Sequence, residues 1–120
     1  MSHLTYTAIA HFTKPLVWLH GEVKTPPLSK AARLNAGFLL RQLQLGMSLT
    51  MPHARPMPAI GPRCLELRIP DNPNTWRILL RLDSDAILIL EVFSKNTQAT
   101  PKTIIKTCKQ QAARYDSLDD

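Results

Sequence analysis

The chain has 120 residues, of which 44% are hydrophobic and 20% are charged, and its formal net charge is +6. These values fit one globular domain over residues 1–120, and no apolar run approaches the roughly 20 residues that span a bilayer. The start lacks the basic-then-apolar plan of a signal peptide, so we expect a cytoplasmic protein without membrane contact. The positive charge favours a polyanion or an acidic protein as partner, through long-range attraction.

The two cysteines, Cys64 and Cys108, are too few for a disulfide framework, and neither has a second Cys or His at metal-ligand spacing. We therefore expect two reduced, buried thiols, no metal site and no cofactor. Residues 116–120 are rich in aspartate and are expected to form a short acidic tail.

The first part of the chain predicts a strand and a helix. Residues 1–14 show no clear period and are treated as an N-terminal arm, while residues 16–20 favour a short strand that Gly21 ends. The proline before this strand suits an edge position. A helix begins at prolines 26–27, where a missing amide proton costs little, and Gly46 stops it. Its apolar stripe has helical spacing and consists of Leu28, Ala32, Ala36, Leu39 or Leu40, and Leu43.

Residues 46–62 are rich in proline and include two glycines, which predicts a loop without a regular element. A stiff loop that leads directly into a sheet can hold polar side chains over one of its faces. His53 and Arg55 are the polar candidates in this loop, and Arg63 follows it.

Three apolar runs, residues 63–69, 75–82 and 86–93, are separated by turn-forming residues and predict an antiparallel meander. The first two runs alternate, because a strand repeats every two residues. One face is therefore apolar, and the opposite face collects Glu66, Arg68, Arg77 and Arg81. The third run is apolar on both faces except at Glu91, as expected for a strand that is covered on both sides.

A final helix follows the meander. Thr100 is a suitable N-cap, and Pro101 takes the favoured first helical position. The helix has a weak apolar stripe, and the basic residues cover the rest of its surface: Lys102, Lys106, Lys109 and Arg114. The predicted fold class is α+β, with a strand, a helix, a small antiparallel three-stranded meander and a C-terminal helix.

The sequence has no Gly-rich phosphate loop, no Gly-x-Ser-x-Gly elbow and no His-Glu-x-x-His motif. A cluster of Arg, Lys and His on one sheet face remains, and such a cluster suits phosphodiester chemistry. A guanidinium can hold the scissile phosphate with two hydrogen bonds and offset the charge of the transition state. A lysine or histidine can move protons to and from the ribose 2′-hydroxyl and the leaving oxygen. The structural alternative for Glu66 is ion pairing with Arg68, Arg77 or Arg81.

Four segments carry a resemblance to a known family. They are residues 66–68 (Glu-Leu-Arg), 76–79 (Trp-Arg-Ile-Leu), 86–90 and 93–101. The last segment is similar to the pattern Phe-x-Lys-Lys-Thr-x-x-Thr-Pro that precedes a C-terminal helix. In this order, and over roughly residues 15–115, the chain resembles the RelE/HigB superfamily of type II toxin–antitoxin ribonucleases, and in particular its phage-derived-protein branch.

The resemblance implies a RelE-like α+β fold and a metal-independent endoribonuclease that cleaves mRNA, on the ribosome, and so inhibits translation. It also implies a cognate antitoxin, a DNA-binding protein with a helix-turn-helix. Arg68 resembles the strand arginine of the family that contacts the scissile phosphate, and Lys95 matches the basic residue after the last strand. Arg55 and Arg63 lie where the family has basic loop residues.

The candidate catalytic residues are therefore Arg68, Lys95, Arg55 and His53, with His53 as the candidate base. The candidate RNA-binding residues are Arg63, Arg77, Arg81 and Lys102, and Arg77 could either pair with Glu66 or contact RNA. Two departures from the family pattern favour an alternative function. Asn96 replaces the second lysine of the Lys-Lys pair, and Tyr115 is far from the predicted site for a catalytic tyrosine. The alternative is a disarmed toxin, a non-catalytic basic module that binds RNA or a protein.

Overall fold

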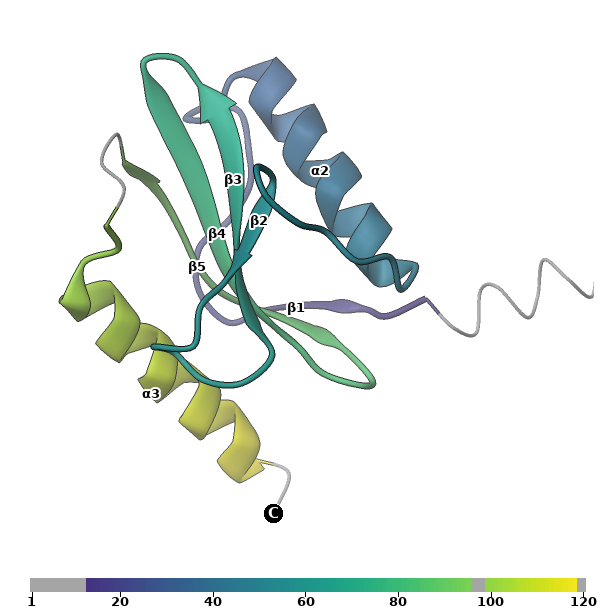
Figure 1. Ribbon diagram of the computed structural model, residues 1–120, viewed down its shortest axis with the longest axis vertical. Coiled ribbons are helices and arrows are strands. Elements are labelled where there is room, and N and C mark those ends of the chain that lie inside the picture. The colour runs from purple at the N-terminus through teal and green to yellow at the C-terminus, as the bar shows by residue number, and fades with distance from the viewer. Residues whose placement is uncertain (1–12, 96–98, 119–120) are drawn as a thin grey trace, which may run out of the picture.

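The computed structural model describes residues 13–95 and 99–118, which form a five-stranded mixed sheet with two helices (Figure 1). Its elements are β1 (Leu16–Trp18), α2 (Lys30–Gln44), β2 (Ala54–Pro56), β3 (Cys64–Asp71), β4 (Asn74–Leu82), β5 (Ile87–Lys95) and α3 (Lys102–Leu118). The predicted α+β class is confirmed. The predicted arm lies almost wholly outside the described residues, and so do Asn96 and the last two aspartates.

The sheet has the order β1-β5-β4-β3-β2. Strands β3, β4 and β5 form the predicted antiparallel meander, in which Arg68 pairs with Arg77, and Arg77 with Phe93. Strand β1 lies parallel to β5 at one edge, as the proline before it suggests. Within the described residues, none of the helices is long and apolar enough to cross a membrane.

The segment predicted as an unbroken loop contains β2, so that prediction is wrong. Arg55 of β2 pairs with Glu66 of β3, and the Arg68 amide donates to the His53 carbonyl at 2.9 Å. A proline is tolerated at the end of this strand because β2 lies at the edge of the sheet, where a missing amide proton removes no ladder bond.

Helix α2 begins three residues later than the prolines at 26–27 suggest. The Ser29 hydroxyl accepts a hydrogen bond from the Ala32 amide at 3.1 Å and caps the helix. The Asp71 carboxylate accepts from the Ser29 amide and from the Trp76 ring nitrogen, both at 3.0 Å, and so ties the start of α2 to the β3–β4 hairpin. The predicted stop is confirmed, because Gly46 has a φ of 85°, which a glycine adopts without strain.

Two apolar layers hold the helices on opposite faces of the sheet. Leu67 and Ile78 belong to the layer that contains the buried residues of α2, whereas Leu79 belongs to the layer that contains Cys108 of α3. Strand β5 contributes Ile89 to the first layer and Leu90 to the second, so it is covered on both sides as predicted. Each such buried side chain stabilises the fold by about 1.5–3 kcal/mol relative to exposure.

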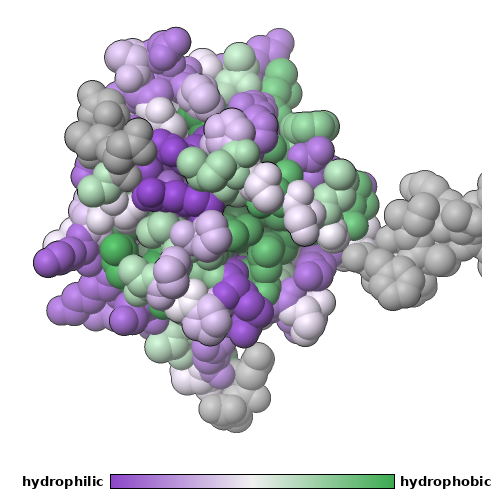
Figure 2. All heavy atoms as spheres, in the orientation of Figure 1, coloured by the Kyte–Doolittle hydropathy of each residue, from purple (hydrophilic) through white to green (hydrophobic). Residues whose placement is uncertain are grey.

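The start of α3 differs from the prediction. The Pro101 carbonyl accepts the Ile105 amide at 3.1 Å, and the helix begins at Lys102, so Pro101 takes the N-cap place expected for Thr100. The Thr100 hydroxyl makes a tertiary hydrogen bond instead. Asp116, expected in an acidic tail, lies inside the helix. In the orientation of Figure 1, strongly hydrophilic residues gather over the sheet between the helices, among apolar ones (Figure 2).

Candidate functional site

Glu66 is the third residue of β3 and is fully buried. Its Oε1 atom accepts hydrogen bonds from Arg55 Nε and from Arg77 Nη1, both at 3.0 Å. Arg68 Nε lies 3.9 Å from the same oxygen. The register explains this convergence, because Arg55 and Glu66 are paired across β2 and β3, and Arg68 and Arg77 across β3 and β4. We name Arg55, Glu66, Arg68, Arg77 and Thr100 the Glu66 cluster.

Thr100 contacts the second carboxylate oxygen. Its hydroxyl donates to Glu66 Oε2 at 3.0 Å, across 34 residues of sequence. Because Thr100 lies two residues before α3, the bond joins the approach to this helix to the centre of the sheet. The two oxygens of Glu66 therefore serve different partners, since one receives guanidinium groups and the other a hydroxyl.

The residues of the Glu66 cluster have a formal net charge of +2, because three of them are arginines and one is a glutamate. The ion pairs of the described residues join these three guanidinium groups to the single carboxylate. Burying a carboxylate is tolerated when such partners surround it. Exposure of the side chains divides the arginines, since Arg77 is 2% exposed, Arg68 17% and Arg55 31%. Arg77 is thus a buried support, and Arg55 and Arg68 form the rim toward solvent.

His53 and Lys95 lie near this rim. His53 directly precedes β2 and is exposed, and its carbonyl oxygen accepts a hydrogen bond from the Arg68 amide. Lys95 ends β5 and is half-buried. It pairs with Thr75, which alternates onto the same face as Arg77, so Lys95 shares the face of the Glu66 cluster. From Arg68 it lies two strands across and about two residues along, roughly 10 Å and 7 Å respectively.

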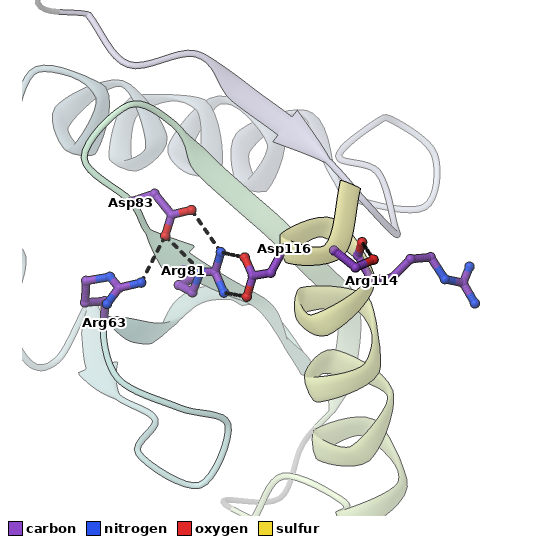
Figure 3. A network of polar contacts seen from close by, with 6 residues as sticks. Arg63, Arg81, Asp83, Arg114 and Asp116 are labelled. Atoms are coloured by element: carbon purple, nitrogen blue, oxygen red, sulfur yellow. Dashed lines mark hydrogen bonds and ion pairs between the residues drawn. The ribbon is translucent and has the colours of Figure 1, made fainter. Parts of the chain in front are cut away.

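A second polar cluster lies on β4 and α3 and contains Arg63, Arg81, Asp83 and Asp116, named here the Arg81 cluster (Figure 3). Arg81 donates to Asp83 from Nε at 2.8 Å and from Nη2 at 2.9 Å. It also donates to Asp116 from Nη1 at 3.0 Å and from Nη2 at 2.7 Å. Arg63 Nη2 lies 3.4 Å from Asp83 Oδ1. Two guanidinium groups here meet two carboxylates, so the charges balance.

The Arg81 cluster fastens α3 to the sheet. Hydrogen bonds donated by Arg81 lower the pKa of Asp116, and the bonds that Arg81 donates to Asp116 and Asp83 raise the pKa of Arg81 above its ordinary value. Arg81 is almost buried and directs its guanidinium at these carboxylates. The sequence did not predict this structural role for Arg81. A signal was present in α3, because Asp116 follows Ala112 by four residues and Cys108 by eight, which places it on the stripe of the helix that faces the sheet.

The structure places the remaining candidates at the surface or in the core. Arg63 and Lys102 are exposed, with Arg63 in the ion pair to Asp83. Cys64 and Cys108 are buried free thiols, as expected, and burial raises the pKa of Cys108 to about 12. Residues 13–95 and 99–118 bring together no group of three or more His, Cys, Asp or Glu side chains that could hold a metal ion.

Comparison with known families gives a match over most of the chain. Residues 27–113 match the model of the family described as phage-derived protein Gp49-like (DUF891). The match spans well over half of the chain, and the protein therefore belongs to this family, whose members are RelE-like and toxin-like. No curated protein matches the chain. The matched range contains the whole Glu66 cluster, whereas Asp116 of the Arg81 cluster lies beyond it.

Proposed function

We propose that the protein is the toxin of a type II toxin–antitoxin system and cleaves mRNA, on the ribosome, as a metal-independent endoribonuclease. One observation carries the proposal. The Glu66 cluster presents two partly exposed guanidinium groups, with an excess of positive charge, on a rigid sheet face. Membership of a toxin-like family supports the same conclusion.

In the proposed reaction, Arg68 and Arg55 hold the scissile phosphate through charge-assisted hydrogen bonds. His53 takes the proton of the ribose 2′-hydroxyl, whose oxygen attacks phosphorus. The bond to the 5′ oxygen then breaks, this oxygen takes a proton from a water molecule, and a 2′,3′-cyclic phosphate remains. Lys95 and the two arginines offset the negative charge that builds up on the phosphoryl oxygens.

The proposed RNA-contact surface includes Arg63, which directly precedes β3, and Lys102, the first residue of α3, and both are exposed. Arg77 and Arg81 also belonged to the contact set predicted from the sequence. Their burial and their ion pairs favour supporting roles instead, with Arg77 held by Glu66 and Arg81 by two aspartates. The proposed contact set is therefore smaller than the one predicted from the sequence.

The proposal includes a protein partner. A toxin of this kind requires an antitoxin, expected to be a DNA-binding protein with a helix-turn-helix. An acidic or apolar segment of the antitoxin would cover the basic sheet face and compete with RNA, since both would contact Arg55 and Arg68. Co-expression with the product of an adjacent small gene, followed by co-purification, tests this partner directly.

The decisive experiment compares induced expression of the wild-type protein, Arg68→Ala and Arg41→Ala. Arg41 is exposed on α2, on the opposite face of the sheet, and its replacement removes the same charge. We expect growth arrest and new in-frame mRNA 5′ ends with the wild-type protein and with Arg41→Ala, and neither with Arg68→Ala. Full toxicity and unchanged cleavage by Arg68→Ala would contradict the role of Arg68.

A non-catalytic basic module is the second candidate, because Asn96 stands where the family pattern has its second lysine. This module would bind RNA or an acidic protein without cutting. It predicts RNA affinity that falls steeply with salt concentration, together with intact RNA after long incubation with ribosomes. Normal growth and intact mRNA after induction of the wild-type protein would favour this candidate.

A further inference from the structure

We infer that Glu66 is a positioning residue of the RNA-cleaving site, and that Thr100 holds Glu66 in the orientation that this role requires. The inference rests on the proposed function and deepens it. It starts from the finding that one buried oxygen, Oε1, is the common acceptor for Arg55 and Arg77 and lies 3.9 Å from Arg68 Nε.

The position of Glu66 is unfavourable for simple phosphate binding. A carboxylate beside a phosphate repels it, and Glu66 cancels one of the three positive charges around it. An anion site made only for affinity would omit this group. A carboxylate is useful when the orientation of the guanidinium groups matters more than their total charge, because small errors in geometry cost more in rate than in binding.

Among the three arginines, Arg55 is the one whose side-chain orientation depends most on its bond to Glu66. It lies in β2, a strand of three residues at the edge of the sheet, and its side chain is the most exposed of the three arginines. A long side chain at such a position has many rotamers, and a bond to a fixed acceptor restricts them. Glu66 is such an acceptor, because it is fully buried and belongs to an eight-residue strand that is paired on both sides.

Thr100 completes the arrangement. A carboxylate bonded through one oxygen can still rotate about its last torsion, which is broad and poorly restricted. The Thr100 hydroxyl bonds the other oxygen at 3.0 Å and fixes the plane of the carboxylate. The orientation of Arg55, which is bonded to this carboxylate, is therefore linked to a hydroxyl from the segment just before α3.

The test uses the full-length protein with Glu66→Gln, Thr100→Val and Thr100→Ser. Cleavage of a translated mRNA on purified ribosomes gives kcat and KM, and thermal unfolding identifies variants that do not fold. Glu66→Gln keeps the shape but removes the negative charge, so we expect KM to fall and kcat to fall by roughly 100-fold. For Thr100→Val we expect an unchanged KM and a kcat lower by about 10-fold, with Thr100→Ser close to the wild type.

The split between kcat and KM separates positioning from a merely structural role, which would reduce the amount of active protein without this pattern. Folded Glu66→Gln and Thr100→Val variants with the kcat of the wild type would overturn the inference while leaving the proposed function intact. If Glu66→Gln does not fold, the comparison of Thr100→Val with Thr100→Ser decides alone. A wild-type protein that binds RNA but does not cut it would overturn the proposed function, and the inference with it.

Discussion

The Glu66 cluster and the Arg81 cluster use the same chemistry on the same face of the sheet, yet they differ in charge balance. Two guanidinium groups meet two carboxylates around Arg81, and all four charges are compensated. Three guanidinium groups meet one carboxylate around Glu66, so the residues of this cluster have a formal net charge of +2. The neutral network around Arg81 serves the fold, and the net positive charge of the Glu66 cluster supports the contact with an anionic ligand proposed for it.

The two clusters also differ in what covers them. Asp116 closes the Arg81 cluster from the last turn of α3 (Figure 3). In the Glu66 cluster the bond to Glu66 Oε2 comes from Thr100, which lies before the start of this helix, and Arg55 and Arg68 are partly exposed. The first cluster ties a helix to the sheet, whereas the second keeps two arginine side chains partly exposed to solvent. Four changes test this division, and the largest effect is expected at the carboxylate with the most partners.

Glu66→Ala should lower the free energy of unfolding by about 3–5 kcal/mol, because it leaves several guanidinium groups without their shared buried partner. Urea denaturation at neutral pH measures the change. Glu22→Ala is a suitable control, since Glu22 is exposed and pairs only with the exposed Lys24 among the ion pairs of the described residues. Equal stability of the two variants would show that Glu66 does not hold its cluster together.

Arg68→Ala should reduce kcat/KM for mRNA cleavage by roughly 100- to 1,000-fold, the usual effect of removing a donor that stabilises a developing oxyanion. The loss of stability should be much smaller than for Glu66→Ala, because Arg77 and Arg55 still donate to the carboxylate. The two variants thus separate fold from function within one cluster. If Arg68→Ala lost much stability but cleaved mRNA at the rate of the wild type, Arg68 would be a structural residue and not a part of the cleavage site.

The sequence predicted what depends on local pattern. Alternation of apolar and polar residues gave both faces of the meander, and the pairing of Glu66 with Arg77 was one of two alternatives for Arg77. Contacts between distant segments gave no local signal. Strand β2 exists because its three residues pair with β3, and Thr100 donates to Glu66 instead of capping the helix that follows it.

Composition was a weaker guide than spacing at Asp116. The aspartates near the end of the chain predicted an acidic tail, but Asp116 continues the helical stripe of Cys108 and Ala112 toward the sheet. A charged residue on an inward stripe requires a partner of opposite charge. Arg81, predicted on the sheet face below, is that partner, so the pair was readable from the two patterns together.

Arg81→Met should lower the free energy of unfolding by about 1–3 kcal/mol, because the nearly buried Asp83 loses its closest donor. The affinity for RNA and the rate of cleavage should stay unchanged. Arg114→Met is the matched control. Arg114 is exposed on α3, the helix that also carries Asp116, and its side chain points away from the Arg81 cluster (Figure 3). Weaker RNA binding by a folded Arg81→Met variant would restore to Arg81 the RNA contact predicted from the sequence.

The smallest effect is expected at Asp116, whose exposed carboxylate is screened by solvent. Hydrogen bonds donated by Arg81 lower the pKa of Asp116 from the ordinary value of 3.8, which means that folding stabilises the charged form of this carboxylate. Its contribution to stability is therefore fully present above about pH 4 and is lost as the pH falls through the lowered pKa. Asp116→Asn should be slightly less stable than the wild type at pH 7, by thermal unfolding. The difference should shrink as the pH drops below 4 and as salt is added, and a difference that persists in acid would mean that packing of α3, and not the charge of Asp116, holds this end of the helix.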